Sequence, residues 1–415
     1  MTGMESTSVR MGFMIDVAGY GRRSARAKTD VQQRVSALVT EVLRDQGLRL
    51  DQTYHHGTGD GMVVFLPGEI EVHRALVRLL RCATEVLAED NQRYQDRMRL
   101  RMAVVIGPIG PAAIGFSGDA IVEAGRLVDS DTLRAAHGAD LAVLISAQLY
   151  EHTVREGHAG LRHTDFRPVE VQAKEYTRQA WLWHGQPRPA AAPAAEPTTY
   201  TLAAAGGPAC VIGIRPGRIL RVHDMQIWVN SENTDMEMAR FNEFSISSII
   251  RYHGALRDAA GHVVDDVIAG ELSRAVGGHR PVAPGAAFVT GPGALVGTHG
   301  VRRIIHVAAV QGEPGAGFRQ IRHVGACVAN ALALAERLAA DDPAIRFILF
   351  PMLGAGMAGA SVTQTATELV AAAADHLEST PGSLLHGIRF LAYADAERVA
   401  LGEALRGNPL LTPAP

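Results

Sequence analysis

A stretch rich in proline and alanine in the middle of the chain constrains its fold most. Residues 184–198 contain four prolines and no large apolar side chain. Such a stretch cannot contribute to a hydrophobic core, and its prolines favour an extended backbone. We therefore predict a linker at residues 184–200 between two domains, residues 1–183 and residues 201–415, each of a length usual for one domain.

Composition narrows the classes of protein. Lys and Arg total 40 and Asp and Glu total 43, so the formal net charge of the 415 residues is -3. General nucleic-acid and membrane-surface binders usually carry a basic excess, so neither class is expected. No apolar run reaches the ~18 residues of a membrane span, and the first ten residues lack a signal-peptide pattern. The three cysteines show no pairing pattern, which favours a reducing, cytoplasmic location.

Apolar periodicity in residues 1–183 predicts a β-α-β-β-α-β-α-β order, which gives a mixed sheet with helices on one face. The predicted strands are Met11–Ile15, Leu50–Tyr54, Met62–Leu66, Met102–Ile106 and Leu141–Ile145. The predicted helices are Thr29–Gly47 with Thr29 as N-cap, Val72–Leu87, Ile121–Val128, and a short helix begun by Ser146.

Two aspartates lie at the ends of predicted strands. Asp16 follows the first strand, and Asp60 lies in the glycine-rich turn Gly57–Gly61. If these strands are neighbours, both carboxylates could bind the divalent ions that accompany a nucleoside triphosphate. A hairpin turn also favours Gly-Asp-Gly for its backbone geometry, so the turn by itself leaves a purely structural role open.

Four segments of this half occur together in one order, and they are Phe13–Tyr20, Gly57–Phe65, Arg101–Gly107 and Gly118–Leu127. Together they resemble the class III nucleotidyl (adenylyl and guanylyl) cyclase domain. The resemblance implies a ferredoxin-like mixed sheet, Mg²⁺ or Mn²⁺ bound by Asp16 and Asp60, and a homodimer whose site both subunits build. It also implies that Arg126 stabilises the transition-state phosphate and that Lys174 contacts phosphates. A solvated surface lysine remains an alternative for Lys174.

This half departs from the cyclase pattern at three positions. Val122 stands where the family has the asparagine that orients the ribose, and His56 and Gly115 stand at the two base-recognition positions. Valine cannot hydrogen-bond, and glycine has no side chain to read a purine edge. We therefore expect a non-standard base preference if the domain is a phosphorus-oxygen lyase, and the sequence leaves open whether it is an active enzyme.

Residues 201–415 alternate between strands and helices, which predicts a parallel sheet covered on both faces. The predicted strands are Ala209–Ile214, Gln226–Val229, Ala286–Thr290, Arg303–Ala308, Arg346–Phe350 and Ile388–Tyr393. The predicted helices are Val264–Val276, Val324–Ala340 and Val362–His376, the last opened by a Ser361–Gln364 capping box.

Two loops of this half are suited to a ligand. Phe350–Ala360 is a glycine-rich loop between a strand and a helix, where backbone N–H groups can meet a diphosphate. Ordinary tight turns use the same glycines, so the loop alone is a weak signal. Trp228–Asp235 places two asparagines at a strand end, where asparagine also commonly makes a simple turn.

With the strand Ile304–Ala309 between them, these loops resemble the macro domain, the ADP-ribose-binding module, across roughly residues 209–395. The resemblance implies a three-layer α/β/α fold with an ADP-ribose-like ligand. It assigns Asn230 and Asn233 to the nucleotide loop and the distal ribose. The diphosphate would be lined by Gly354, Ala355, Gly356, Met357 and Gly359. His306 is interpreted as a structural strand residue.

The macro-like half also departs from its pattern. Bulky and polar residues, 235–244, replace the glycine-rich run that follows the second asparagine, and Arg218 stands near the position of the adenine-contacting aspartate. ADP-ribosyl hydrolysis is therefore doubtful, although Asp235 or Glu237 could act as a base, while nucleotide binding is retained as the expectation.

Together the two resemblances predict a nucleotide-signalling protein, in which a divergent domain binding Mg-NTP is coupled to an ADP-ribose-binding macro domain. One alternative is a non-catalytic nucleotide receptor or scaffold. Another is an ADP-ribosyl hydrolase with an inert cyclase-like domain.

Overall fold

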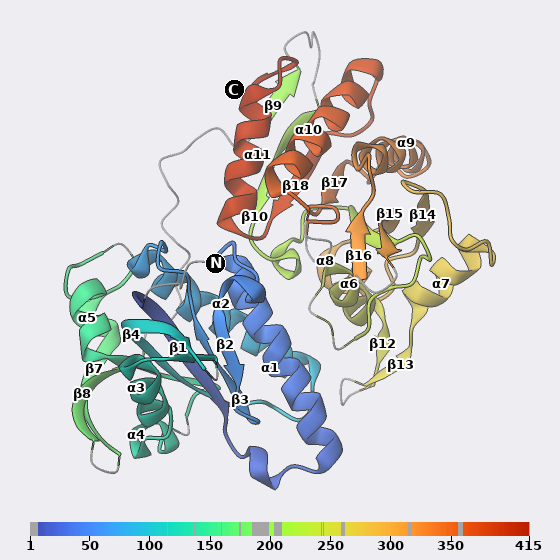
Figure 1. The fold of residues 1–415 in the computed structure, drawn as a ribbon. Helices are drawn as coiled ribbons and strands as arrows, with labels where there is room; N and C mark the ends of the chain where they lie inside the picture. The colour runs from blue at the N-terminus through green and yellow to red at the C-terminus, as the bar shows by residue number, and fades with distance from the viewer. Residues whose placement is uncertain are drawn as a thin grey trace. The chain divides into compact units, whose positions relative to one another are not determined.

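The computed structural model forms two compact units, Met1–Pro193 and Ala194–Pro415 (Figure 1). It describes residues 7–113, 115–136, 138–158, 160–173, 176–184, 199–202, 210–241, 243, 245–258, 262–313, 317–355 and 360–414. The division falls within the predicted linker, most of which lies outside the described residues. Thr199 and Tyr200, which the prediction placed in the linker, belong to a strand.

The N-terminal unit contains one mixed sheet with the strand order β2-β3-β1-β4-β6-β8-β7, and β5 pairs with β4. Its strands are β1 Ser8–Val17, β2 Tyr54–Gly57, β3 Gly61–Phe65, β4 Leu100–Ala112, β5 Gly115–Ser117, β6 Leu141–Ser146, β7 Phe166–Ala173 and β8 Tyr176–Trp183. Its α-helices are α1 Ala25–Asp45, α2 Val72–Arg93, α3 Asp119–Val128, α4 Asp131–Arg134 and α5 Ala147–Thr153. The β4–β6 pair is parallel, and β1 is antiparallel to both of its neighbours. The predicted mixed sheet is confirmed, and β1 to β4 follow the ferredoxin-like β-α-β-β-α-β plan.

Helices cover both faces of this sheet, so the prediction of helices on one face is wrong. Ala103 and Val105 of β4 pack with Ala124 and Leu127 of α3. Alternate residues of β4 point to the opposite face, where α1 contacts β3 and α2 contacts β6. The reason lies in the central strands, because every residue of β6 is buried and such a strand must be covered on both sides.

Several element ends differ from the prediction. Helix α1 begins at Ala25 because Ser24, not Thr29, is its N-cap, and the Ser24 hydroxyl accepts from the Ala27 N–H. Leu50–Gln52 is a 3-10 turn rather than a strand. Ser146 caps α5 as expected.

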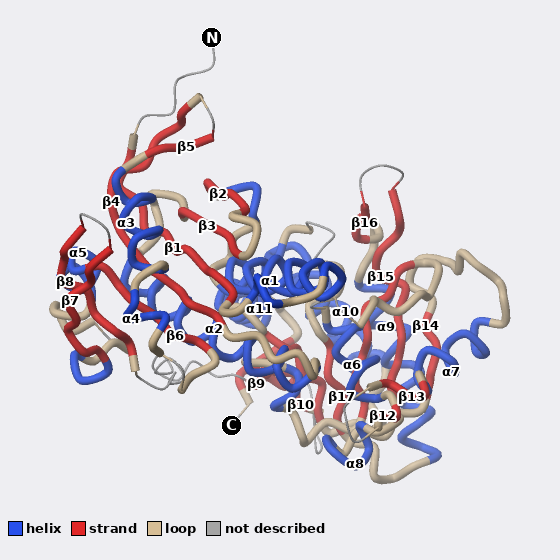
Figure 2. Tube along the Cα trace, turned by 90° about the horizontal axis from the view of Figure 1, so that it is seen from below, coloured by secondary structure: helices blue, strands red, loops and turns tan. Residues whose placement is uncertain are grey.

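The C-terminal unit contains a larger mixed sheet with the order β14-β15-β11-β17-β18-β10-β9-β19, and β16 pairs with β15. Its strands are β9 Thr199–Leu202, β10 Val211–Pro216, β11 Ile227–Asn233, β14 Ala287–Thr290, β15 Arg303–Glu313, β16 Gly317–Gln320, β17 Phe347–Phe350, β18 Gly387–Ala392 and β19 Leu411–Pro413, with a separate hairpin of β12 Leu256–Arg257 and β13 Val263–Asp265. Its α-helices are α6 Ile246–Gly254, α7 Val267–Val276, α8 Leu295–His299, α9 Gly325–Asp341, α10 Val362–Ser379 and α11 Asp395–Gly407. The β15–β16 ribbon projects beyond its sheet, as the β4–β5 ribbon does in the other unit (Figure 2).

Alternation along β11 divides the C-terminal core into two layers. Ile227 and Val229 face a cluster with α9, α10 and α11, whereas Trp228 faces a cluster with α6, α7 and α8. This confirms the predicted three-layer α/β/α fold. Strands β10, β18, β17, β11 and β15 run parallel, so their carboxyl ends share one edge of the sheet. In such sheets ligands bind at that edge.

Candidate functional site

The fold brings Asp16 and Asp60 together at one end of the N-terminal sheet. Asp16 pairs in register with Gly61, and the Val17 N–H donates to the Asp60 carbonyl at 3.1 Å. The two carboxyl groups are close enough to influence each other electrostatically. The β2–β3 hairpin that carries Asp60 was predicted from its glycines, and its strands pair as expected.

Neighbouring groups and burial shift the pKa of the Asp16 carboxyl, not all in the same direction. Burial, followed by the Asp60 carboxylate, raises the pKa of Asp16 to about 6, although the Arg101 guanidinium acts in the other direction. Two adjacent carboxylates repel each other unless a proton or a cation lies between them. Within the described residues no group of three or more His, Cys, Asp or Glu side chains could hold a metal ion.

Arg101 is a site residue that sequence reasoning missed. It lies opposite Asp16 in the β1–β4 register, and its guanidinium forms an ion pair with the Asp16 carboxylate. An arginine among the apolar residues of a central strand was the available signal. Arg101 begins the cyclase-like segment Arg101–Gly107, but the resemblance implied no role for its side chain.

The other N-terminal positions lie on surface elements. His56 is exposed on β2, and Gly115 begins β5 with φ +98°. The Tyr54 and Phe116 rings stack with their centroids 5.6 Å apart, so β2 and β5 are neighbours. Arg126 is exposed on α3, one turn after the half-exposed Val122, and Lys174 lies outside the described residues.

A buried polar cluster occupies the carboxyl end of β11. Asn230, Glu232 and His306 are at most 2% exposed. The Asn230 amide donates to Glu232, whose Oε1 also accepts from the Ser247 hydroxyl at 2.9 Å. His306 lies 3.6 Å from Glu232, and Thr290 contacts the other ring nitrogen of His306 at 3.0 Å.

The cluster contains two residues singled out from the sequence, Asn230 and His306, and one that was not, Glu232. Burial raises the pKa of Glu232, against the opposing effect of His306. The Asn230 side chain points into the cluster, and His306 has the interior strand position expected of it. Sequence reasoning missed Glu232, for which the signal was a charged residue inside a strand.

Asn233 lies at the end of β11 and closes a turn. Its side chain donates to the Glu237 carbonyl at 3.1 Å and accepts from the Glu237 N–H at 3.2 Å. The enclosed turn holds the exposed Asp235 and the buried Met236, whose φ is 52°. The side chain of Asn233 is thus engaged by its own loop.

The segment after this turn is folded into the unit. Met236 and Met238 are buried in the core with α6 and α7. Arg251 of α6 donates to the carbonyls of Met238 and Ala239 at 3.1 and 2.9 Å. The buried side chains of Met236 and Met238 and the guanidinium of Arg251 therefore fix the segment that stands where the macro pattern has a glycine-rich run.

The glycine-rich loop after β17 is described in part. Gly354 has φ +68°, and the Gln320 side chain packs against it while donating to the Leu353 carbonyl at 2.7 Å. The Ala355 N–H donates to the Met352 carbonyl at 3.3 Å. The predicted diphosphate positions Gly356, Met357 and Gly359 lie outside the described residues.

Ser361 caps α10, but the Gln364 side chain donates to Glu368 instead of completing the predicted capping box.

Arg218 and Tyr393 meet at the same edge of the sheet. Each follows a parallel strand, β10 and β18 respectively, and the Arg218 guanidinium donates to the Tyr393 hydroxyl. Arg218 is 6% exposed. The residue near the adenine-contacting position is thus engaged within the protein.

Comparison with known proteins identifies part of the C-terminal unit. Residues 229–369 match the model of the Macro domain family, so this part of the chain is a macro domain. The match spans the asparagine-bearing end of β11 and the glycine-rich loop after β17. No curated protein matches the chain in sequence.

Solved structures of two kinds are similar to parts of the chain. The Oceanobacillus iheyensis macrodomain with ADP is 14% identical over 50% of this chain and 95% of that chain, with a TM-score of 0.37. The Trypanosoma brucei macrodomain in complex with ADP-ribose is 15% identical over 46% and 68%, with a TM-score of 0.35. The guanylyl cyclase Cya2 is 13% identical over 44% of this chain and 93% of that chain, with a TM-score of 0.33.

None of the described helices is both long and apolar enough to cross a membrane.

Proposed function

We propose that the macro domain binds ADP-ribose or a closely related nucleotide. The observation that carries the proposal is the family match over residues 229–369, which includes both loops at the carboxyl edge of the sheet. Backbone N–H groups at such an edge suit a diphosphate. The O. iheyensis and T. brucei macrodomains were solved with ADP and with ADP-ribose, which is consistent with this ligand class.

Calorimetric titration of the full chain with ADP-ribose tests this proposal. The variant Gly354→Ala should weaken binding, because a Cβ there would lie 2.8 Å from the Gln320 Cγ and would be strained at φ +68°. Gly382→Ala is the matched control, since its Cβ would meet no atom within 4 Å. Failure of the native chain to bind at millimolar ADP-ribose would refute the proposal.

For the N-terminal unit, we propose that Asp16 and Asp60 bind Mg²⁺ or Mn²⁺ together with a nucleoside triphosphate. The supporting observation is the β1–β3 pairing that brings the two carboxylates to one end of the sheet, where a cation would relieve their repulsion. His56 and Gly115 suggest a base other than adenine. Arg126 and Lys174 are proposed to contact phosphates across a homodimer.

Equilibrium binding of each NTP with Mn²⁺ tests the metal site. Asp60→Asn should abolish the metal-dependent part of binding, whereas Asp30→Asn, an exposed acid on α1, should leave it unchanged. Product analysis of the same mixtures separates a cyclase from a non-catalytic receptor.

Binding is favoured over ADP-ribosyl hydrolysis as the role of the macro domain. The segment that follows Asn233 is anchored by Met236 and Met238 and is held by Arg251. Asp235 and Glu237 remain as exposed acids at this tight turn. Incubation with an ADP-ribosylated peptide should release no ADP-ribose, and release that Asp235→Asn abolishes would favour the hydrolase.

Coupling of the two units would make the chain a cytoplasmic nucleotide-signalling protein.

A further inference from the structure

The half-buried side chain of Gln320 joins the two ends of the glycine-rich loop that follows β17. Its amide nitrogen donates to the Leu353 carbonyl at 2.7 Å and to the Thr365 hydroxyl at 3.0 Å. Leu353 lies near the start of the loop and is fully buried, and Thr365, in the first turn of α10, is 1% exposed. One side chain from a third part of the chain therefore bridges the strand side and the helix side of this loop.

The chemistry of these contacts fixes the direction of the Gln320 amide. A carbonyl oxygen can only accept, so the nitrogen of the amide, and not its oxygen, must face Leu353. An amide nitrogen carries two hydrogens, and the contacts with Leu353 and Thr365 use both. Rotation of the amide would place its oxygen against the Leu353 carbonyl, so the arrangement has one favoured orientation.

Gly354 permits the close approach of this side chain. Its φ of +68° favours glycine, and a Cβ there would lie 2.8 Å from the Gln320 Cγ and 3.2 Å from its Nε2. The Gln320 side chain thus occupies the space that a larger residue at position 354 would need. The backbone at Leu353 and Gly354 is therefore packed against Gln320 as well as hydrogen-bonded to it.

The base of the β15–β16 ribbon connects Gln320 to the other loop of the proposed nucleotide site. Val310 of β15 lies in register both with Gln320 of β16 and with Asn233 at the end of β11. The Val310 carbonyl accepts from the Thr234 N–H at 2.9 Å, inside the turn that Asn233 closes. The ribbon, which projects beyond its sheet (Figure 2), therefore contacts both loops at the carboxyl edge.

We propose that Gln320 is a positioning residue of the nucleotide site, which holds the start of the glycine-rich loop in the conformation that binds a diphosphate. The inference rests on the proposed function of the macro domain. Ordering a glycine-rich backbone costs conformational entropy, so a loop that is held in place before the ligand arrives binds it more tightly. Because Gln320 also belongs to the ribbon, nucleotide binding and the order of the ribbon are coupled, and each strengthens the other.

Calorimetric titration of the full chain with ADP-ribose, and with AMP, which lacks the diphosphate, tests the proposal. Gln320→Met keeps nearly the same side-chain length but removes both donors, so it should weaken ADP-ribose binding about tenfold and AMP binding less than about twofold. Gln311→Met, the same substitution on β15 of the same ribbon, is the matched control and should change neither. Thr365→Val should weaken ADP-ribose binding severalfold in the native chain but little further in Gln320→Met, because both changes remove one shared hydrogen bond.

Hydrogen exchange of the native chain gives a second readout that needs no variant. ADP-ribose should slow amide exchange in β16 as well as in residues 353–355, because Gln320 joins the two segments. In Gln320→Met the ligand should no longer protect β16.

Three results would overturn the proposal while leaving the proposed function intact. One is equal affinity of the native chain and Gln320→Met for ADP-ribose. Another is an equal loss of affinity for AMP and ADP-ribose in that variant, which would indicate a general structural role. The third is protection of residues 353–355 without protection of β16 in the native chain. A native chain that binds no ADP-ribose would instead refute the proposed function, and this inference with it.

Discussion

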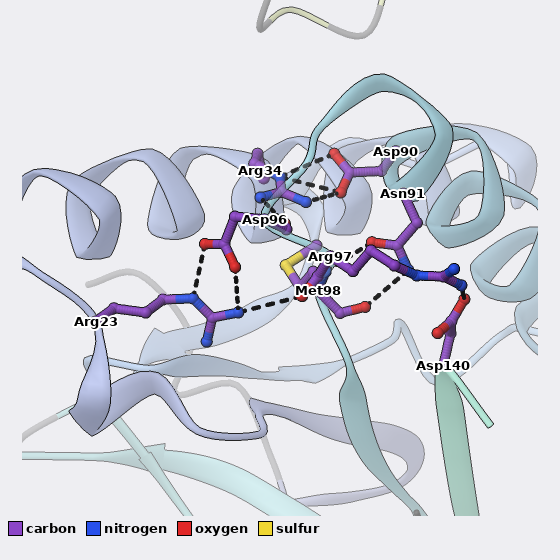
Figure 3. A network of polar contacts seen from close by, with 8 residues as sticks. All are labelled: Arg23, Arg34, Asp90, Asn91, Asp96, Arg97, Met98 and Asp140. Carbon is purple, nitrogen blue, oxygen red and sulfur yellow. Dashed lines mark hydrogen bonds and ion pairs between the residues drawn. The ribbon is translucent and has the colours of Figure 1, made fainter. Parts of the chain in front are cut away.

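Neutralising Asp90 should destabilise the N-terminal unit far more than neutralising an exposed acid. The Arg34 and Asp90 side chains are 3% and 0% exposed, and the Arg34 Nε donates to Asp90 at 3.0 Å. Asp90→Asn preserves the side-chain volume but leaves a buried guanidinium without its counter-charge. Breaking a buried pair in this way costs about 3–5 kcal/mol. Because Arg34 also donates to the Asp96 carbonyl, the segment that carries Asp96 and Arg97 should loosen as well (Figure 3).

Urea denaturation of the full chain measures this loss, with hydrogen exchange in α1 and α2 assigning it to the N-terminal unit. Glu151→Gln is the control, because the Arg155–Glu151 side chains are 70% and 46% exposed and such pairs contribute below about 1 kcal/mol. The double variant Arg34→Met, Asp90→Leu should recover most of the stability, since it removes both charges. Equal losses in Asp90→Asn and Glu151→Gln would refute the reasoning that desolvation governs this pair.

Three further predictions concern other buried or capping groups. Burial raises the pKa of Glu232 above its ordinary 4.5, so this residue stabilises the fold most below pH 4.5, and its contribution is lost as the pH rises through the folded value. Glu232→Gln should therefore raise the melting temperature at pH 8 and change it little at pH 4, and the reverse pattern would count against the buried carboxyl. Burial raises the pKa of Cys327 to about 12, so alkylation of this thiol at pH 8 should occur only after unfolding, as mass spectrometry can follow. Ser24→Ala should cost about 1 kcal/mol by removing the α1 cap, whereas Thr29→Ala should cost less, as paired urea titrations can measure.

The fold was predictable where apolar periodicity was strong. Most predicted helices and strands are present, because their spacing reflects which side chains are buried. The errors concern features that depend on tertiary contacts. Thr29 and Ser24 are both competent caps, and the choice between them is made by where the preceding chain leaves β1. The two-sided burial of β6 depends on its neighbours in the sheet, so its apolar run alone did not place the helices.

The sequence indicated candidate site residues, but it did not indicate which charged and polar side chains surround them. The resemblance pointed to Asp16 and Asp60, and strand pairing brings them together. Sequence spacing gave no sign that Arg101 lies opposite Asp16, because that contact depends on the β1–β4 register. The burial of Asn230 with Glu232 depends in the same way on the packing of β15 against β11. Residues far apart in sequence create these electrostatic environments.

The ion pair between Arg101 and Asp16 makes Asp16→Asn informative about function. If the carboxylates hold a metal-bound NTP, this variant loses NTP binding in Mn²⁺ while its urea denaturation stays native-like. A misfolded variant would lose native-like denaturation as well, and a scaffold with no ligand in this unit would bind no NTP even as the native chain. Loss of binding without loss of stability therefore separates a metal site from a purely structural role of Asp16.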